Sequence, residues 1–101
     1  MLRLMTTTKI AKGKGVKAVE WASQWVEFLK KYKSIPPVHV YSSIIGESGL
    51  IIFFADYDDF AHYQKAVVEV RANNEYTQRI DDAADLFIEG SSANTMLNLI
   101  A

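Results

Sequence analysis

The stretch Leu50–Ala55 limits the fold of this chain more than any other, because every one of its residues is apolar. A strand with an apolar residue at every position has an apolar side chain on both faces of its sheet. The stretch therefore predicts a strand that is buried on both faces.

Three further strands are predicted around it. Residues 2–10 alternate between two faces, which is typical of a strand. Residues 38–45 form the next predicted strand, and the turn Gly46-Glu47-Ser48-Gly49 joins it to the apolar strand as a hairpin. Residues 95–100 form the last one.

Helical periodicity covers residues 16–33 and ends before Pro36, since proline breaks a helix. A second helix is predicted from near Tyr57, with Asp56 as its N-cap, to about Ala72. Residues 75–85 predict another helical turn or two. The apolar stripes are Val16-Val19-Ala22-Val26-Leu29 and Trp21-Trp25-Phe28-Tyr32 on the first helix, and Phe60-Tyr63-Val67-Val70 on the second.

The order of elements predicts one α+β domain over residues 1–101, with the ferredoxin-like βαββαβ topology. Its four-stranded antiparallel sheet has two helices on one face. The other face has no cover within the chain, and an exposed apolar patch usually marks an interface. We therefore expect a homodimer through the open sheet face, with a different partner chain or a half-polar exposed face as the alternatives.

Composition excludes several classes of function. The net charge of −1 provides no field that would attract nucleic acid or an anionic membrane. The longest apolar run, residues 49–55, is too short to span a bilayer, and the first residues lack the layout of a signal peptide. The absence of cysteine removes disulfides and thiolate chemistry, and it fits a cytoplasmic protein.

Two short motifs are better explained without a ligand. Gly13-Lys14-Gly15 has the spacing of a dinucleotide-binding loop, but no acidic residue follows at the distance that the ribose needs, so no cofactor is expected. Asp81, Asp82 and Asp85 have no neighbouring ligands and indicate a solvated helix surface rather than a metal site.

Five segments together resemble the dimeric α+β barrel superfamily, which includes antibiotic-biosynthesis-monooxygenase-like and NIPSNAP-like proteins. They are Gly15 at the start of a Trp-containing helix, the hairpin at 46–49, and the segments 56–60, 74–76 and 86–91. The resemblance implies a homodimeric barrel that binds its ligand between sheet and helices. It also implies a cofactor-independent oxygenase as one activity. Haem-degrading members use an Asn, Trp and His trio, and this chain has Thr6, Phe60 and Arg71 in the corresponding elements.

Three functions remain open: a protein that binds a small apolar or aromatic ligand, a cofactor-independent oxygenase-like enzyme acting on an aromatic or polyketide-type molecule, and a non-catalytic interaction module. Gln64 and Arg71 fall near the apolar stripe of the second helix, and two interpretations stay open. In one they line a pocket between helix and sheet; in the other, which is favoured, Arg71 extends to solvent near the helix end and Gln64 bonds a backbone group. His62 is predicted to be solvated, and His39 is an edge-strand residue or a pocket acid or base. The candidate pocket residues are His39, Tyr41, Tyr63, Gln64, Arg71 and Trp25.

Overall fold

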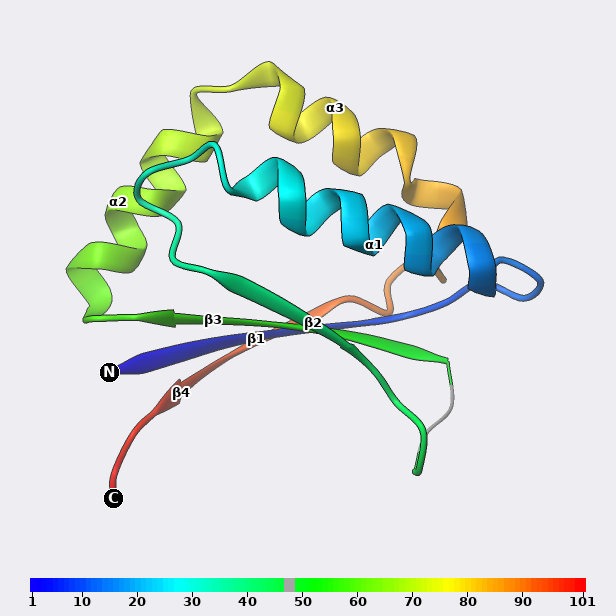
Figure 1. Ribbon diagram of the computed structural model, residues 1–101, viewed down its shortest axis with the longest axis horizontal. Coiled ribbons are helices and arrows are strands. Elements are labelled where there is room, and N and C mark those ends of the chain that lie inside the picture. The colour runs from blue at the N-terminus through cyan, green and yellow to red at the C-terminus, as the bar shows by residue number, and fades with distance from the viewer. Residues whose placement is uncertain (47–48) are drawn as a thin grey trace.

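A computed structural model describes residues 1–46 and 49–101 as a four-stranded sheet with its helices on one side (Figure 1). The strands are β1 (Leu2–Lys9), β2 (Val38–Ser42), β3 (Leu50–Tyr57) and β4 (Ala93–Asn98). They lie in the order β2-β3-β1-β4, and every neighbouring pair is antiparallel. This confirms the predicted α+β ferredoxin-like fold, because the two central strands are the first and third in the chain.

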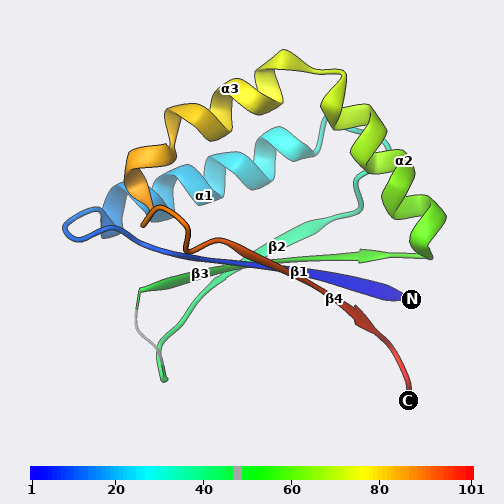
Figure 2. The same ribbon diagram turned by 180° about the vertical axis from the view of Figure 1, so that it is seen from behind.

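Three α-helices lie on one side of the sheet (Figure 1), and the third is in the stretch where the sequence predicted another helical turn or two. They are α1 (Gly15–Leu29), α2 (Phe60–Arg71) and α3 (Asn74–Asp82), and a short 3₁₀ turn (Ala84–Leu86) follows. The break after α2 is present, but Asn73 then caps a new helix, because its Oδ1 accepts the backbone N–H of Glu75 at 2.9 Å. Figure 2 shows α3 lying above α1, farther from the sheet.

The predicted N-terminus of the second helix was wrong by three residues. Asp59, not Asp56, is the N-cap, and its Oδ1 accepts the N–H of His62 at 2.8 Å. Asp56 instead belongs to β3, where its side chain pairs with Arg3 on the neighbouring strand. The apolar run therefore belongs to a strand that continues to Tyr57.

The first helix also ends earlier than predicted, at Leu29, and residues 30–32 continue as turns with i→i−3 hydrogen bonds. Its buried side is the Trp-containing stripe together with Ala18, Ala22 and Leu29, whereas Val16 is 76% exposed. The aromatic stripe packs into the larger core cluster and against Tyr76 of α3, where it buries more apolar area than the valines would.

Within this single chain β3 is buried on one face, and burial of its other face remains a prediction that requires a partner. Ile51 is 2% exposed and Ala55 is 7% exposed on the helix side, while Ile52 and Phe54 on the other side are only half-buried. The reason is that none of the described elements covers the second face (Figure 1).

The ends of the edge strands differ from the prediction as well. β2 stops at Ser42, and Ile44 and Ile45 beyond it are 92% and 91% exposed. The predicted turn at 46–49 includes residues 47 and 48, which lie outside the described residues. Gly46 and Gly49 beside them have φ of +94° and +77°, a region that glycine adopts without strain.

Two apolar clusters between helices and sheet form the core. The larger contains Trp25, Phe28, Leu29, Tyr32 and Val70, and the smaller contains Ala55, Tyr57 and Ala66. Among the described residues, none of the helices has the length and apolar character needed to cross a bilayer.

Candidate functional site

A cavity of about 820 Å³, open to solvent, lies between the sheet and the three helices. Its volume is in the range of small-molecule sites, about 300–1,000 Å³. β1 and β3 form the floor, α1 and α2 the walls, and α3 with the following turn the roof.

The walls of the cavity are aromatic. The rings of Trp21 and Trp25 stack with their centroids 5.2 Å apart, and Tyr76 lies 5.0 Å from Trp25. On the side of the cavity opposite α1, the rings of Tyr57 and Tyr63 meet edge to face, with their centroids 5.4 Å apart. Because these rings also pack against one another, the walls are held in place without a ligand.

One end of the floor is polar. Thr6 donates its hydroxyl hydrogen to Asn94 Oδ1 at 2.8 Å, and Ser92 donates to Thr8 Oγ1 at 3.0 Å. All four side chains line the cavity. The sequence reasoning did not select them, although the alternation of β1 places Thr6 and Thr8 on the same face as Leu4. Hydroxyl groups at one end of an apolar cavity orient a ligand that has a polar group.

Burial disfavours the ionised form of two phenols that line the cavity, Tyr57 and Tyr76. It raises the pKa of Tyr57 to about 12 and also raises the pKa of Tyr76, because a phenolate would lose its hydration there. Both side chains therefore act as neutral hydrogen-bonding groups.

No residue of the roof helix α3 is fully buried, although Tyr76 packs against Trp25, and charged side chains add further contacts with α1 and the turn after it. Lys31 Nζ lies 2.8 Å from Glu75 Oε1, and the Arg79 guanidinium lies 4.2 Å from the centre of the Phe28 ring. The hydrogen bond from Lys31 and its charge lower the pKa of Glu75 below its ordinary value of 4.5.

We expect the contact between Lys31 and Glu75 to weaken in acid, so that α3 is attached less firmly at low pH. A carboxylate with a lowered folded-state pKa stabilises the fold above its unfolded pKa, and this stabilisation is lost as the pH falls through the folded value. Amide hydrogen exchange of α3 should therefore accelerate relative to that of α1 below about pH 4.5. In Glu75→Gln, α3 should exchange faster at neutral pH and show a smaller acid response; an unchanged response would contradict this role of Glu75.

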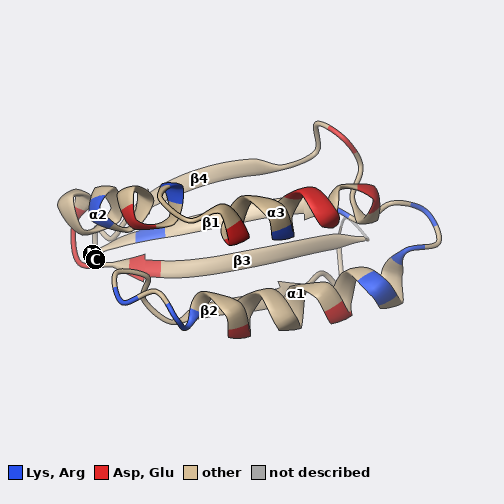
Figure 3. Ribbon diagram, turned by 90° about the horizontal axis from the view of Figure 1, so that it is seen from above, with Lys and Arg blue, Asp and Glu red and all other residues tan. Residues whose placement is uncertain are grey.

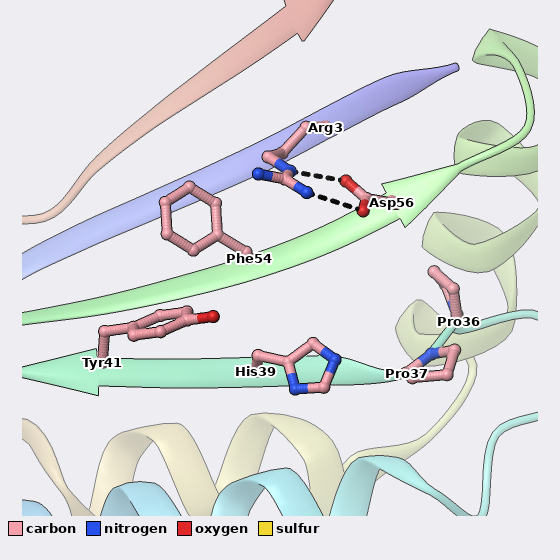
Figure 4. A pocket seen from close by; sticks show the side chains of 7 residues that line it. All are labelled: Arg3, Pro36, Pro37, His39, Tyr41, Phe54 and Asp56. Atoms are coloured by element: carbon pink, nitrogen blue, oxygen red, sulfur yellow. Dashed lines mark hydrogen bonds and ion pairs between the residues drawn. The ribbon is translucent and has the colours of Figure 1, made fainter.

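A second, smaller pocket of about 270 Å³ lies on the open face of the sheet (Figure 4). Arg3 binds Asp56 through two hydrogen bonds of 2.7 and 3.0 Å, which lowers the pKa of Asp56. The Phe54 ring lies beside the Arg3 guanidinium at 5.2 Å and beside Tyr41 at 5.5 Å. His39 completes the row along β2.

The predicted pocket residues are therefore divided between three places. Trp25 and Tyr63 line the large cavity, and His39 and Tyr41 line the pocket on the open face. Gln64 and Arg71 are exposed and line neither, which corrects their choice as candidate pocket residues and agrees with the alternative that Arg71 extends to solvent. The inward side of α2 is centred on Ala66 and Val70, and at about 100° per residue Gln64 and Arg71 lie roughly 140° and roughly 120° away from that centre.

His62 is not the freely solvated residue that the sequence predicted. Its Nδ1 accepts the backbone N–H of Asp58 at 3.1 Å, and its Nε2 lies 2.9 Å from the carbonyl oxygen of Ser34. Because Nδ1 accepts a hydrogen bond, the proton of the neutral ring is on Nε2, which donates a hydrogen bond to the carbonyl oxygen of Ser34. Glu69 also accepts the Ser34 N–H, at 3.2 Å, so this part of α2 fastens the loop before β2.

In the part of the chain that the structure describes, no three His, Asp or Glu side chains gather into a potential metal site.

Comparison with solved structures links this arrangement to known folds. An uncharacterised NIPSNAP domain protein from Burkholderia xenovorans superposes with a TM-score of 0.82 at 18% identity, over 100% of this chain and 96% of that one. A putative antibiotic biosynthesis monooxygenase from Deinococcus radiodurans gives 0.74 at 13% identity, over 100% and 94%. The chain has the fold of these proteins.

A further neighbour is a NIPSNAP family protein with unknown function from Agrobacterium tumefaciens, with a TM-score of 0.77, 13% identity and coverage of 96% and 86%. The resemblance stated from the sequence is thus confirmed at the level of fold. No family profile and no curated protein matches the sequence. At these identities the likeness shows a shared architecture, and the chemistry depends on the residues of this chain.

Proposed function

We propose that this protein binds a small apolar or aromatic molecule in the cavity between sheet and helices. The observation that supports the proposal is the cavity itself: about 820 Å³, with aromatic walls and hydroxyl groups at one end. A protein with no ligand to bind would be expected to fill this space with side chains, since protein interiors are close-packed.

Binding is favoured over catalysis by the residues that surround the cavity. A cofactor-independent oxygenase needs a base that removes a proton from its substrate. Among the described lining residues there is no His or Lys, and the raised pKa of Tyr57 keeps its phenol protonated. The carboxylates that line the cavity, Asp81 and Glu89, belong to exposed residues at one end of it. His39, the base suggested by the sequence, lies on the opposite face of the sheet.

Two adjacent valines of α2 provide a matched test of this proposal. Val67 lines the cavity, whereas Val68 is 70% exposed on the outside of the same helix. Val67→Trp should place an indole in the cavity and weaken the binding of 1-aminoanthracene, a neutral fluorescent probe, at least about tenfold, because the probe and the indole compete for the same space. Val68→Trp should leave binding unchanged.

Probe fluorescence and isothermal titration calorimetry would measure both dissociation constants. Circular dichroism should show equal helix content in the two variants. Equal affinities in both variants, or no binding of the probe by the wild type, would contradict a ligand-binding cavity and favour an interaction module.

We further propose that the protein is a homodimer through the open sheet face, as part of the same function. The paired residues Met5 and Phe54 at the centre of this face are only half-buried, and Leu97 beside them is 41% exposed. Arg3 and Lys9 at its two ends are exposed, so an apolar centre with a polar rim is presented to a partner. A two-fold axis through the centre would cover both copies with one contact.

A cytoplasmic location is included in this proposal, because a chain without cysteine fits a reducing compartment.

A further inference from the structure

We propose that the cavity selects hydrophobic amines in their protonated form and disfavours carboxylates and phosphates. This inference rests on the proposed function, since it states which ligands the cavity takes. It depends on the charges and ring faces around the cavity.

Asp81 and Glu89 are the charged side chains that line the cavity in the described residues, and both are acidic. Asp81 is in the last turn of α3, and Glu89 is in the loop that leads into β4. Figure 3 shows these two segments in red at the same end of the molecule. Neither carboxylate has a hydrogen-bond or ion-pair partner in the part of the chain that the structure describes, so their negative charge is uncompensated.

Nearby basic side chains are engaged elsewhere. Lys14 pairs with Asp85 at 3.7 Å, and Lys31 pairs with Glu75 on the side of α1 that contains Phe28. Arg79 also lies over Phe28. Phe28 does not line the cavity, so the charged groups of Lys31 and Arg79 are held outside the cavity. An anionic ligand would therefore lose its hydration without gaining a positive partner.

The aromatic walls add a second, independent preference for a cation. An aromatic ring has a negative face that attracts an ammonium group within about 6 Å of its centre. Trp21 and Tyr76 flank Trp25 on one wall, with centroids 5.2 and 5.0 Å from it. Because Trp25 is stacked against both Trp21 and Phe28, the half-buried Trp21 and Tyr76 are the rings of this group that an ammonium group can reach. A ligand with an apolar ring and an ammonium group can bury the ring between these walls and place its charge near Asp81 or Glu89.

Three naphthalene compounds test the charge preference at nearly constant shape: 1-naphthylmethylammonium, 1-naphthylmethanol and 1-naphthoate. Calorimetry at low ionic strength should rank the cation first, the alcohol second and the carboxylate last. We expect about a tenfold ratio between cation and carboxylate, since two charges at a solvent-open mouth act through a dielectric close to that of water. The ratio should decrease in 0.5 M salt, a condition chosen because salt screens the interaction between the ligand's charge and the two carboxylates.

The double variant Asp81→Asn/Glu89→Gln should reduce that ratio to about one and leave the affinity for the alcohol unchanged. The control Glu20→Gln/Glu27→Gln changes the net charge equally on the exposed surface of α1, outside the cavity, and should keep the wild-type ratio. If the alcohol binds but the three affinities are equal, or the double variant keeps the ratio, the charge inference is overturned and the proposed function stands. If none of the three binds, the proposed function fails as well.

Discussion

Trp25→Ala is expected to lower the free energy of unfolding by about 3–5 kcal/mol, which is a large part of the total stability of a small domain. Trp25 is 8% exposed and packs in the larger core cluster, in contact with the rings of Trp21, Phe28 and Tyr76. Its removal leaves space beside the existing cavity, and the aromatic group loses its central member. Urea unfolding followed by circular dichroism, at a fixed protein concentration, measures the change.

Two variants serve as controls for Trp25→Ala. Trp25→Phe retains a ring and should recover part of the lost stability. Val16→Ala is in the same helix, but its side chain is 76% exposed, so its effect should stay within about 0.5 kcal/mol. A loss below about 1 kcal/mol for Trp25→Ala would contradict the core position of this residue.

Ile52→Lys is expected to weaken the proposed homodimer by about a thousandfold or more. Ile52 pairs with Thr7 on β1 and Tyr41 on β2, so it lies near the middle of the open sheet face. A two-fold contact would bury two added ammonium groups without partners, and each costs several kcal/mol. Sedimentation velocity at micromolar concentration should show a dimer for the wild type and an 11.4 kDa monomer for the variant.

The matched control for this prediction is Val68→Lys, which adds the same charge on the exposed side of α2 and should leave the dimer intact. Circular dichroism of Ile52→Lys should match the wild type, because in the isolated chain this position is already half-exposed. A wild type that sediments as a monomer would contradict the homodimer, and the fold would remain as described.

Much of the architecture could be predicted because it depends on local patterns. The alternation of residues 2–10 indicated β1, and the run from Leu50 indicated β3 as a central strand. The boundary at Asn73 was also visible, since Asn favours the cap of a helix over its interior. The N-terminus of α2 was missed because Asp56 and Asp59 are both good caps, and only the partner strand with Arg3 shows that Asp56 stays in β3.

The candidate site was predicted less well, because its members come from elements that are distant in sequence. Trp25 and Tyr63 were selected and do line the cavity, but Thr6, Ser92 and Asn94 were not. Their grouping follows from the pairing of β1 with β4, which no local pattern shows.

The sequence by itself determined the order of the elements, the central position of β3 and the apolar stripes of the helices. Only the tertiary structure decided that the aromatic stripe of α1 packs against Tyr76 of α3, that Gln64 is exposed, and that His39 lies on the opposite face of the sheet from the cavity. The physical reason is that periodicity gives angles around an element's own axis. The rotation of that axis, and its distance from the sheet, are set by contacts with residues far along the chain.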